Sequence, residues 1–237
     1  MLKIENLTKK YGDKVAVDNL SLEISGGEIC AFIGHNGAGK TTTLKACIGI
    51  LSFDSGDIYI DGKSVREYPL ETKAVTAYIP DNPDMYEFLS GIKYLNFIAD
   101  VFGVSESERN TRIPALAERL GITDALADSI GSYSHGMKQK LAIIAAFLHK
   151  PRIILMDEPF VGLDPRASFT LKEMMREHCE AGGSIFFSTH VLDVAERLCD
   201  RVAIIKGGKL VVSGKMDEVR GDASLEEVFL ELEDNNA

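Results

Sequence analysis

Hydrophobic and polar residues alternate near the start of the chain. Residues 2–5 alternate between apolar and charged side chains, and residues 20–24 repeat the pattern. A period of two is typical of strands that bury one face. Further on, the apolar segment 58–60 leads into Asp61-Gly62, a pair that favours a tight turn. These segments predict a β-rich layer in the first part of the chain.

Other apolar runs are continuous. They cover residues 29–33, 153–156 and 185–187. A continuous run of this length is typical of a strand that is buried on both faces of a parallel sheet. A hairpin is predicted for residues 202–212, because two apolar segments there flank a pair of glycines. The chain therefore combines a buried sheet with the alternating layer.

Helical spacing dominates the middle of the chain. From Asn82 to about Lys150, apolar residues recur every three or four positions with no strand pattern between them. Asp164-Pro165 supplies an N-cap and a first-turn proline for a further helix. Residues 224–227 form a capping box for a short last helix, and residues 233–237 are expected to fray. The pattern predicts a helical insertion within an α/β domain.

Composition limits the classes of protein to which the chain can belong. The sequence has 237 residues, 45% of them hydrophobic, and 36 acidic against 26 basic residues give a formal net charge of -10. This charge argues against nucleic acid as a partner. The longest apolar run, residues 141–148, is shorter than the about 20 residues that a membrane span needs, and the N-terminus does not resemble a signal peptide. We therefore expect a cytoplasmic protein.

The four cysteines have no spacing typical of a metal site. In a compartment that keeps thiols reduced, we expect them to be structural free thiols. They are Cys30, Cys47, Cys179 and Cys199.

A glycine-rich loop follows the apolar run 29–33. It has the pattern G-x-x-x-x-G-K-[ST] and leads into a segment with the composition of a helix's first turns. Glycines let successive N–H groups point inward, and the helix N-terminus adds its dipole, so the loop forms a cradle for nucleotide phosphates. The alternative is a glycine-rich turn that matches the pattern by chance. The loop residues, all predicted to bind the nucleotide, are Gly34, His35, Asn36, Gly37, Ala38, Gly39, Lys40, Thr41 and Thr42.

Two carboxylates follow the apolar run 153–156. Asp157 and Glu158 stand where a buried strand ends, at the edge where α/β sheets bind ligands. In a P-loop protein, Asp157 would hold the magnesium shell and Glu158 would act on water, whereas the alternative is a helix-capping pair. His190 ends the next buried strand over the same crevice, although such a histidine is more often a helix cap or a hydrogen-bonded surface residue. Tyr11 is either an ordinary hairpin aromatic or a platform for a base.

The order of these motifs resembles that of the ATP-binding cassette (ABC) ATPases, the nucleotide-binding subunits that power membrane transporters. The phosphate loop is shared with many NTPases. The specific features are a signature segment at 133–139, then Asp157-Glu158, Gly162-Leu163-Asp164 and His190. The resemblance covers the chain from Leu2 to about Leu232.

The resemblance implies roles in ATP binding. Tyr11 would stack on adenine, and Val17 would lie on the base or ribose. Residues 34–42 would hold the triphosphate, and Thr41 and Asp157 would hold Mg²⁺.

Catalytic and dimer roles follow from the same resemblance. Glu158 would be the general base, His190 would contact the γ-phosphate, and Asp164 would lie in a loop that communicates across the dimer. Two copies would form a head-to-tail homodimer, in which each ATP lies between one phosphate loop and the partner's signature segment. The signature residues predicted to act in this way are Ser134, His135, Gly136 and Met137.

Two positions depart from the family's usual pattern. The signature is usually Leu-Ser-Gly-Gly-Gln, and His135 here replaces a glycine; we expect its side chain to face solvent or the partner's nucleotide. Asp81 stands where the family has a glutamine that touches magnesium, and we expect its contact to run through a metal-bound water. The pattern Ser134-x-Gly136-Met137 and the acidic residue after Ile79-Pro80 both resemble the branch that serves drug and antibiotic exporters, as does the ending 224–230.

The resemblance also implies partners. A separate integral membrane permease would provide the membrane contact, with the apolar residues around 85–94 at its groove, about half of them in the interface. No nucleic acid is expected. The alternatives are a soluble ABC ATPase of the DNA repair or translation type and an ATP-binding scaffold.

The predicted fold is α/β, a P-loop NTPase (RecA-like) core with an antiparallel β layer and a helical insertion. We expect a single domain, with its core at 1–81 and 150–215, the helical part at about 82–149, and a C-terminal helix and tail at 216–237.

Overall fold

The alternating segments near the N-terminus form an antiparallel sheet. The computed structural model of the chain describes residues 1–234. Strands β1 (Leu2–Tyr11), β2 (Lys14–Ile24), β4 (Ser55–Ile60) and β5 (Lys63–Ser64) lie in the order β2-β1-β4-β5. Asp61 and Gly62, between β4 and β5, have φ angles of 53° and 78°. Two successive positive φ angles are typical of the tight turn that the sequence predicts.

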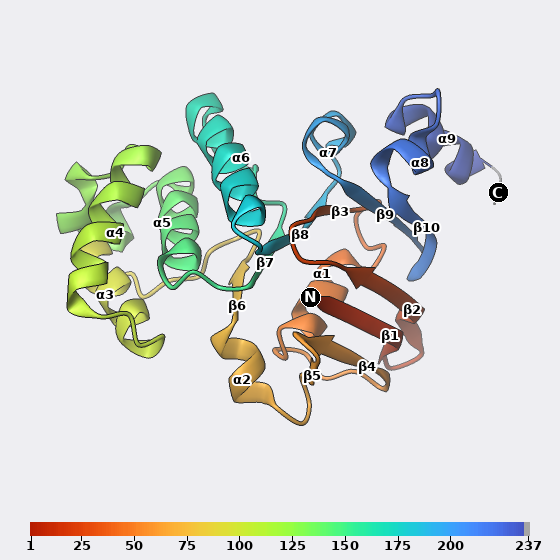
Figure 1. Cartoon of the computed structure of the whole chain (residues 1–237), viewed down its shortest axis with the longest axis horizontal. Coiled ribbons are helices and arrows are strands. Elements are labelled where there is room, and N and C mark those ends of the chain that lie inside the picture. Colours follow the sequence, from red (N-terminus) through yellow and green to blue (C-terminus); the bar gives the residue numbers. More distant parts are fainter. Residues whose placement is uncertain (235–237) are drawn as a thin grey trace.

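The continuous apolar runs form the centre of a second sheet of six strands, in the order β10-β9-β3-β8-β7-β6 (Figure 1). Strands β3 and β6 to β9 run parallel, and β10 pairs antiparallel with β9 in the predicted hairpin. Every residue of β3, β7 and β8 is buried. The parallel order brings the carboxyl ends of these strands to one edge of the sheet. The strands are β3 (Ile29–Ile33), β6 (Thr76–Ile79), β7 (Ile153–Asp157), β8 (Ser184–Thr189), β9 (Arg201–Lys206) and β10 (Lys209–Lys215).

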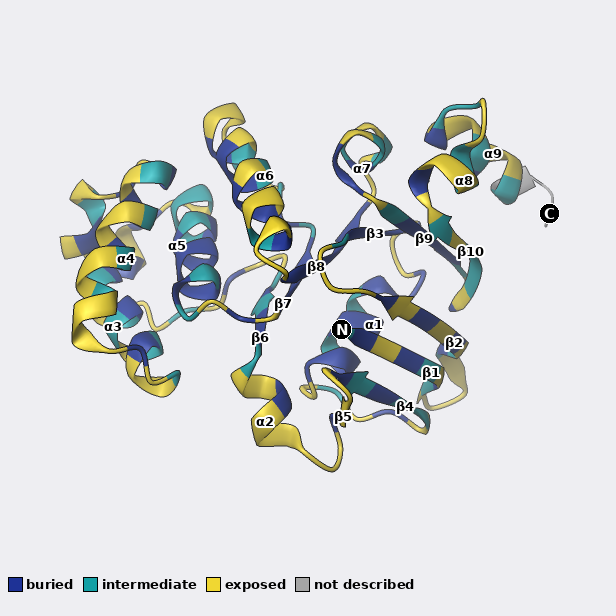
Figure 2. Ribbon diagram, in the orientation of Figure 1, coloured by how far each residue is buried: buried dark blue, intermediate teal, exposed yellow. Residues whose placement is uncertain are grey.

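Two hydrophobic cores lie on the two faces of the central sheet. Helix α1 (Lys40–Cys47) packs between the two sheets, where it contacts β7 and β2, and its Leu44 and Cys47 are fully buried. The opposite face is covered by α5 (His135–Leu148), α6 (Pro165–Glu180) and α7 (Leu192–Leu198). Figure 2 shows the buried stripe of each helix turned towards the sheet. Helix α1, which follows the phosphate loop, is therefore enclosed by the antiparallel sheet on one side and the central sheet on the other.

The predicted helical insertion contains three long helices. α3 (Gly91–Val101), α4 (Glu106–Leu120) and α5 lie side by side at one end of the molecule (Figure 1). Short 3₁₀ turns at Asp124–Ala127 and Ile130–Ser132 link α4 to α5. The P-loop fold with an antiparallel layer and a helical region is therefore confirmed. The residue boundaries that divide the domain into parts stay a prediction.

The predicted helix caps at Asp164 and Ser224 are present. Each accepts a hydrogen bond from the backbone N–H three residues on, of Ala167 (2.8 Å) and Glu227 (3.2 Å). Ser134 caps α5 in the same way, with the Met137 N–H at 3.3 Å. Helices α2 (Pro69–Ala74) and α8 (Met216–Arg220) are short and were not expected from the pattern. The last helix, α9 (Leu225–Asp234), includes residues 233 and 234, which were expected to fray. Residues 235–237 of the same prediction lie outside the described residues.

The cysteines and the longest helices agree with the expectations from composition. All four cysteines are buried free thiols. Burial raises the pKa of Cys30 and of Cys179 to about 12, which keeps both protonated and unreactive near neutral pH. Within residues 1–234, every helix is too short or too polar to cross a bilayer.

Candidate active site

The phosphate loop connects β3 to α1 and fits closely against neighbouring backbone. A Cβ at Gly34 would lie 2.4 Å from the Ile205 carbonyl oxygen, and one at Gly39 would lie 2.5 Å from the Ala16 carbonyl oxygen. Gly39 also has a φ of 111°, which side chains rarely adopt. Both positions therefore require glycine for a structural reason as well as for phosphate binding.

Lys40 begins α1 and places its charge inside this loop. The residue is 6% exposed, and its Nζ lies 2.5 Å from the Gly34 carbonyl oxygen and 3.9 Å from Glu158 Oε1. Burial lowers the pKa of Lys40 below its ordinary value, although the negative charges of Glu158 and Asp157 oppose the shift. An anion bound beside the ammonium would favour its charged form. The arrangement is that of a phosphate site.

Asp157 ends β7 and is held by two hydroxyl groups. Thr41 Oγ1 donates to Asp157 Oδ2 at 2.6 Å, and Ser188 Oγ donates to Oδ1 at 2.5 Å. Asp157 is 1% exposed, so its carboxylate relies on these donors. Sequence reasoning missed Ser188. Its signal is a polar residue at the end of an otherwise apolar strand, directly opposite Asp157 in the β7–β8 register.

Glu158 and His190 form a second polar pair at the same edge. Glu158 Oε2 lies 3.0 Å from His190 Nδ1, and the Glu158 N–H donates to Ser188 Oγ at 3.1 Å. The other carboxylate oxygen, Oε1, is buried and accepts no hydrogen bond from the described part of the chain. Glu158 also has a φ of 47°, an uncommon value for a residue with a side chain. The backbone here turns sharply and directs the carboxylate into the site.

These groups surround a pocket of about 300 Å³ at the carboxyl edge of the sheet. The Lys40 ammonium and the backbone N–H groups of the loop suit a triphosphate, the two carboxylates suit a metal ion bound to it, and exposed Tyr11 lies at the pocket's rim. The predicted loop residues Gly34 and Ala38 are buried beneath it. The lining residues are Tyr11, Lys14, Ala16, His35, Asn36, Gly37, Gly39, Lys40, Thr41, Thr42, Asp81, Asp157 and Glu158.

Val17 is not among the residues that line this pocket, and its contact with the base or ribose stays a prediction. Its side chain is fully buried in the core of the antiparallel layer, close to Gly39. The preceding residue, Ala16, lines the pocket. Successive residues of a strand face opposite sides, so a shift of one position exchanges the core for the ligand. Val17 supports the loop from below.

The signature segment lies at the N-terminus of α5 and is not part of the pocket in its own chain. Ser134 and His135 are exposed. A Cβ at Gly162 would lie 2.4 Å from His135 Cδ2, and one at Gly136 would lie 2.6 Å from the Gly162 carbonyl oxygen. The structure therefore packs the signature segment directly against the loop that carries Gly162.

Two side chains strengthen this contact. Lys140 Nζ lies 2.6 Å from Asp164 Oδ2, and buried Gln139 donates from Nε2 to the Pro159 carbonyl oxygen at 3.4 Å. The pKa of Asp164 is held below its usual range by the hydrogen bond from Lys140 and by the Ala167 N–H. Sequence reasoning did not find Lys140, whose signal is a cation near the start of a capped helix. A displacement of the Gly162 loop would be felt at the start of α5.

The donors at the carboxyl edge fit a magnesium ion bound mainly by a ligand's phosphates. Asp157 and Thr41 offer oxygen atoms, which Mg²⁺ prefers, and the ion commonly uses only one or two protein ligands. Asp81 lines the pocket from its exposed loop, with Oδ1 accepting from the Asn82 N–H at 2.9 Å. Among the described residues, no group of three or more His, Cys, Asp or Glu side chains forms a metal site by itself. The water-mediated contact between Asp81 and the metal ion stays a prediction.

A phosphate loop between a buried strand and a helix, with a carboxylate ending another strand of the same sheet, defines a P-loop NTPase. Residues 17–161 match the family model described as ABC transporter. The chain therefore belongs to the ABC transporter family, and it is an ABC transporter ATPase. The family's signature and phosphate motifs are those whose geometry is described above.

Known proteins resemble the chain over its whole length. It is 36% identical to the ABC-type transporter ATP-binding protein EcsA of Bacillus subtilis (strain 168), covering 100% of this chain and 98% of EcsA. It is 33% identical to the linearmycin resistance ATP-binding protein LnrL of the same organism, covering 90% of this chain and 69% of LnrL.

Two solved structures of ABC transporter components resemble the chain in fold. An ATP-binding subunit of an ABC transporter superposes with a TM-score of 0.94 at 36% identity, covering 98% of this chain and 99% of that one. The cbiO1 protein of Clostridium perfringens, part of the ABC transporter complex cbiONQ, gives a TM-score of 0.78 at 27% identity, covering 99% of this chain and 95% of cbiO1. The chain is an ATP-binding component of an ABC transporter complex.

Tyr11 provides a test of how the base is held. Its ring is 51% exposed at the rim of the pocket. If adenine stacks on it, Tyr11→Ala should weaken ATP binding by about 1–3 kcal/mol, roughly 5- to 150-fold in Kd, while Tyr11→Phe stays close to wild type. Equilibrium titration with a fluorescent ATP analogue measures this, with the exposed Tyr68→Ala as a matched control. Equal affinity in Tyr11→Ala and wild type would leave Tyr11 an ordinary hairpin aromatic.

Proposed function

We propose that the chain is the ATP-hydrolysing subunit of an exporter, that it forms a homodimer around two ATP molecules, and that it drives a separate membrane permease. The observation that carries the proposal is that Lys40 and Glu158 line one pocket and His190 pairs with Glu158, while the signature segment is exposed outside the pocket. The pocket supports hydrolysis, and the outward signature supports a second subunit.

Glu158 is proposed as the general base. Its carboxylate stands beside the phosphate loop, 3.0 Å from His190 Nδ1. It would accept the proton of the attacking water as that oxygen bonds to the γ-phosphorus and the bond to ADP breaks. His190, which is largely exposed, would hold the water and the γ-phosphate in line with this carboxylate.

Lys40 and the metal-binding residues are proposed to stabilise the charge that develops during the reaction. Thr41 and Asp157 would hold Mg²⁺, which neutralises phosphate charge when bound. Ser188 orients the Asp157 carboxylate, and Lys40 adds a fixed positive charge beside it. The family binds ATP, and this donor set supports Mg²⁺ as its cofactor.

A head-to-tail homodimer would complete each site. Ser134 and the free N–H groups at the start of α5 form an anion-binding surface, yet they lie outside their own chain's pocket. Joined to a partner's phosphate loop, they would bind the γ-phosphate of the partner's ATP. His135 and Met137 would flank it, and the contact of His135 with Gly162 would carry the change across the interface.

The permease is proposed to bind next to the Asp81 loop. Tyr86, Phe88 and Phe97 are 53%, 81% and 45% exposed. The centroid of the Tyr86 ring lies 5.9 Å from that of Phe88 and 6.1 Å from that of Phe97. The neighbouring Met85 and Leu89 pack against the core. A cluster of exposed aromatic rings is typical of a protein interface. This aromatic cluster supports the proposal that the protein is cytoplasmic and contacts the membrane only through its permease.

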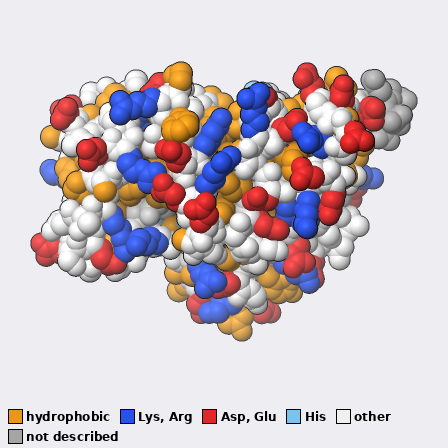
Figure 3. All heavy atoms as spheres, turned by 45° about the horizontal axis from the view of Figure 1, so that its top comes forward, with side chains coloured by type: hydrophobic (Ala, Val, Ile, Leu, Met, Phe, Trp, Pro, Cys, Tyr) orange, Lys and Arg blue, Asp and Glu red, His pale blue; other side chains and the backbone are white. Residues whose placement is uncertain are grey.

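The direction of transport is proposed as export. LnrL, a relative at 33% identity, is a linearmycin resistance protein, and resistance is consistent with removal of a compound from the cell. The departures at His135 and Asp81 support the same branch. The alternative of a soluble DNA-repair type ATPase is weakened because acidic and basic side chains are interspersed on the face shown in Figure 3. We propose no nucleic-acid partner.

Glu158→Gln separates hydrolysis from binding. The variant should bind ATP and dimerise in its presence, while turnover falls by about 10²–10⁴-fold, because the amide cannot accept the water's proton. Steady-state phosphate release and size-exclusion chromatography with ATP measure both, and Glu118→Gln, an exposed glutamate on α4, is the control. Unchanged turnover in Glu158→Gln would falsify Glu158 as the base. ATP binding without turnover in wild type would favour a scaffold.

Phe88→Asp tests the permease surface. Coexpressed with the membrane protein encoded beside it, the wild-type chain should co-purify, and the variant should lose the complex, because a buried unpaired carboxylate is costly. Phe169→Asp is the control, since Phe169 is 62% exposed on α6, away from the aromatic cluster. Equal recovery of both variants would remove this surface from the permease interface. An importer would be revealed by ATP-driven uptake into cells.

A further inference from the structure

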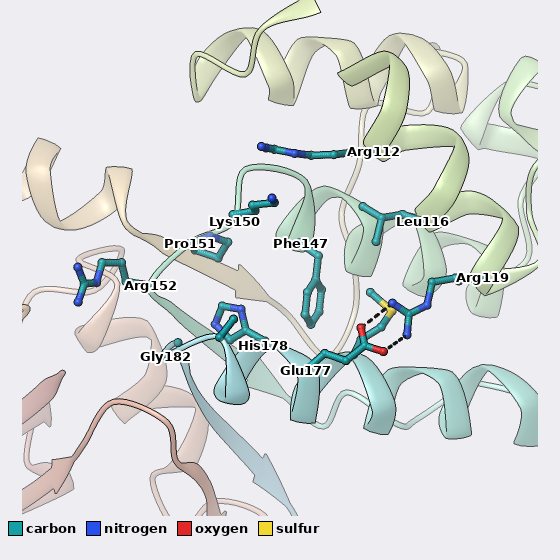
Figure 4. Close-up of a pocket in the computed structure, with 13 residues that line it drawn as sticks. Arg112, Leu116, Arg119, Phe147, Lys150, Pro151, Arg152, Glu177, His178 and Gly182 are labelled. Atoms are coloured by element: carbon teal, nitrogen blue, oxygen red, sulfur yellow. Dashed lines mark hydrogen bonds and ion pairs between the residues drawn. The ribbon is translucent and has the colours of Figure 1, made fainter. Parts of the chain in front are cut away.

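A second cleft of the described structure lies away from the ATP pocket. It measures about 640 Å³ and is formed where α4 and the C-terminal ends of α5 and α6 meet the start of β7 (Figure 4). Because β7 begins beside this cleft and ends at Asp157, the cleft and the ATP pocket lie at opposite edges of the central sheet. A volume of this size is typical of small-molecule sites.

The floor of the cleft is apolar. Leu116 of α4, Phe147 of α5 and Met174 of α6 meet there beside Pro151. Figure 4 shows the Phe147 ring between Leu116 and Pro151, with the His178 ring near it. The two ring centroids are 5.9 Å apart at an angle of 82°. Flat apolar surface of this kind suits an aromatic or alicyclic group.

The rim of the cleft carries more basic than acidic groups. Arg119 is paired with Glu177 through two hydrogen bonds of 2.7 and 2.8 Å, so this cation is neutralised. Arg112 donates to the Leu148 carbonyl oxygen at 3.0 Å and pairs with Glu108. Figure 4 shows Lys150 and Arg112 on the same side of the cleft.

Lys150 is the rim cation whose charge is not used by the fold. It is exposed and makes no ion pair with any residue between 1 and 234. The pKa of Glu108 is lowered mainly by hydrogen bonds from Ser105 and less by the charges of Arg112 and Lys150, and Glu108 is already paired with Arg112. Two cations thus face one carboxylate, in a chain whose net charge is -10. A local excess of positive charge above an apolar floor favours an anion with an apolar body.

We propose that this cleft binds an amphipathic organic anion, with its flat apolar part on Leu116 and Phe147 and its phosphate, sulfonate or carboxylate group on Lys150 and Arg112. The site does not depend on the transport function proposed above. It assigns a second ligand site to the chain, distinct from the ATP pocket in both position and chemistry.

The position of the cleft gives the site a regulatory character. Helix α5 begins at the signature segment, β7 ends at Asp157, and α6 begins directly after Asp164. All three elements have their other ends at the cleft. A ligand in contact with α4, α5 and α6 would therefore fix the helical region against the elements that carry the catalytic and signature residues.

The test uses 1-naphthyl phosphate, a fluorescent aromatic anion. The chain has no Trp, so naphthyl anisotropy can be followed directly. With excess ADP and Mg²⁺ filling the nucleotide pocket, wild type should bind one probe per chain. Lys150→Glu and Lys150→Met should each weaken binding by about tenfold or more, the scale of one charge-assisted hydrogen bond. Lys215→Glu, at an exposed lysine before α8, should bind as wild type does.

Two further probes separate the parts of the ligand. 2-Naphthol has the apolar body without the strong anion, and inorganic phosphate has the anion alone. The affinity of each should be lower than that of naphthyl phosphate by about tenfold or more. Unchanged ADP affinity in both Lys150 variants establishes that they fold. The proposal is overturned if Lys150→Met binds the probe as wild type does, if 2-naphthol binds equally well, or if ADP displaces the probe.

Discussion

The site depends on a buried ammonium group that the fold must keep charged. Lys40 is almost fully buried, with Gly34 and His35 carbonyl oxygens and the Glu158 carboxylate as its partners. An unpaired buried charge would cost several kcal/mol, so these partners are a condition of folding as well as of binding. The segments that follow the parallel strands β3 and β7 supply them, because the carboxyl ends of these strands lie at one edge of the sheet, on either side of β8. The same constraint places phosphate binding and catalytic carboxylates together.

This arrangement fits the proposal that one chain holds only part of an active site. The pocket brings together Lys40, Asp157 and Glu158, whereas Ser134 and His135 of the signature segment are exposed outside it. In the proposed dimer, ATP is part of the interface, and hydrolysis removes the phosphate that joins the two halves. The Gly162 loop, packed under His135 and tied to α5 by the Lys140–Asp164 pair, connects the two events within each subunit.

Much of this could be predicted from local sequence, and the misses have physical causes. The phosphate loop and Asp157 are found from motif and strand pattern because both lie within a few residues of a buried strand. Ala16, which lines the pocket, was not predicted, because the facing of a strand residue depends on register, and β1 and β2 pair with several register shifts. Ser188 and the cleft at Lys150 depend on segments that are distant in sequence and meet only in the folded sheet.

The central claim is that Lys40 and Ser134 of different subunits serve the same ATP, and complementation tests it most directly. Lys40→Ala removes the loop cation, and Ser134→Asp keeps a good N-cap for α5 while placing a negative charge against the γ-phosphate. A mixed dimer of these two single variants should regain one intact site and hydrolyse ATP, whereas a dimer of wild type with the double variant should have none. The opposite result, activity only with the double variant, would mean that both residues act within one chain and would contradict the account.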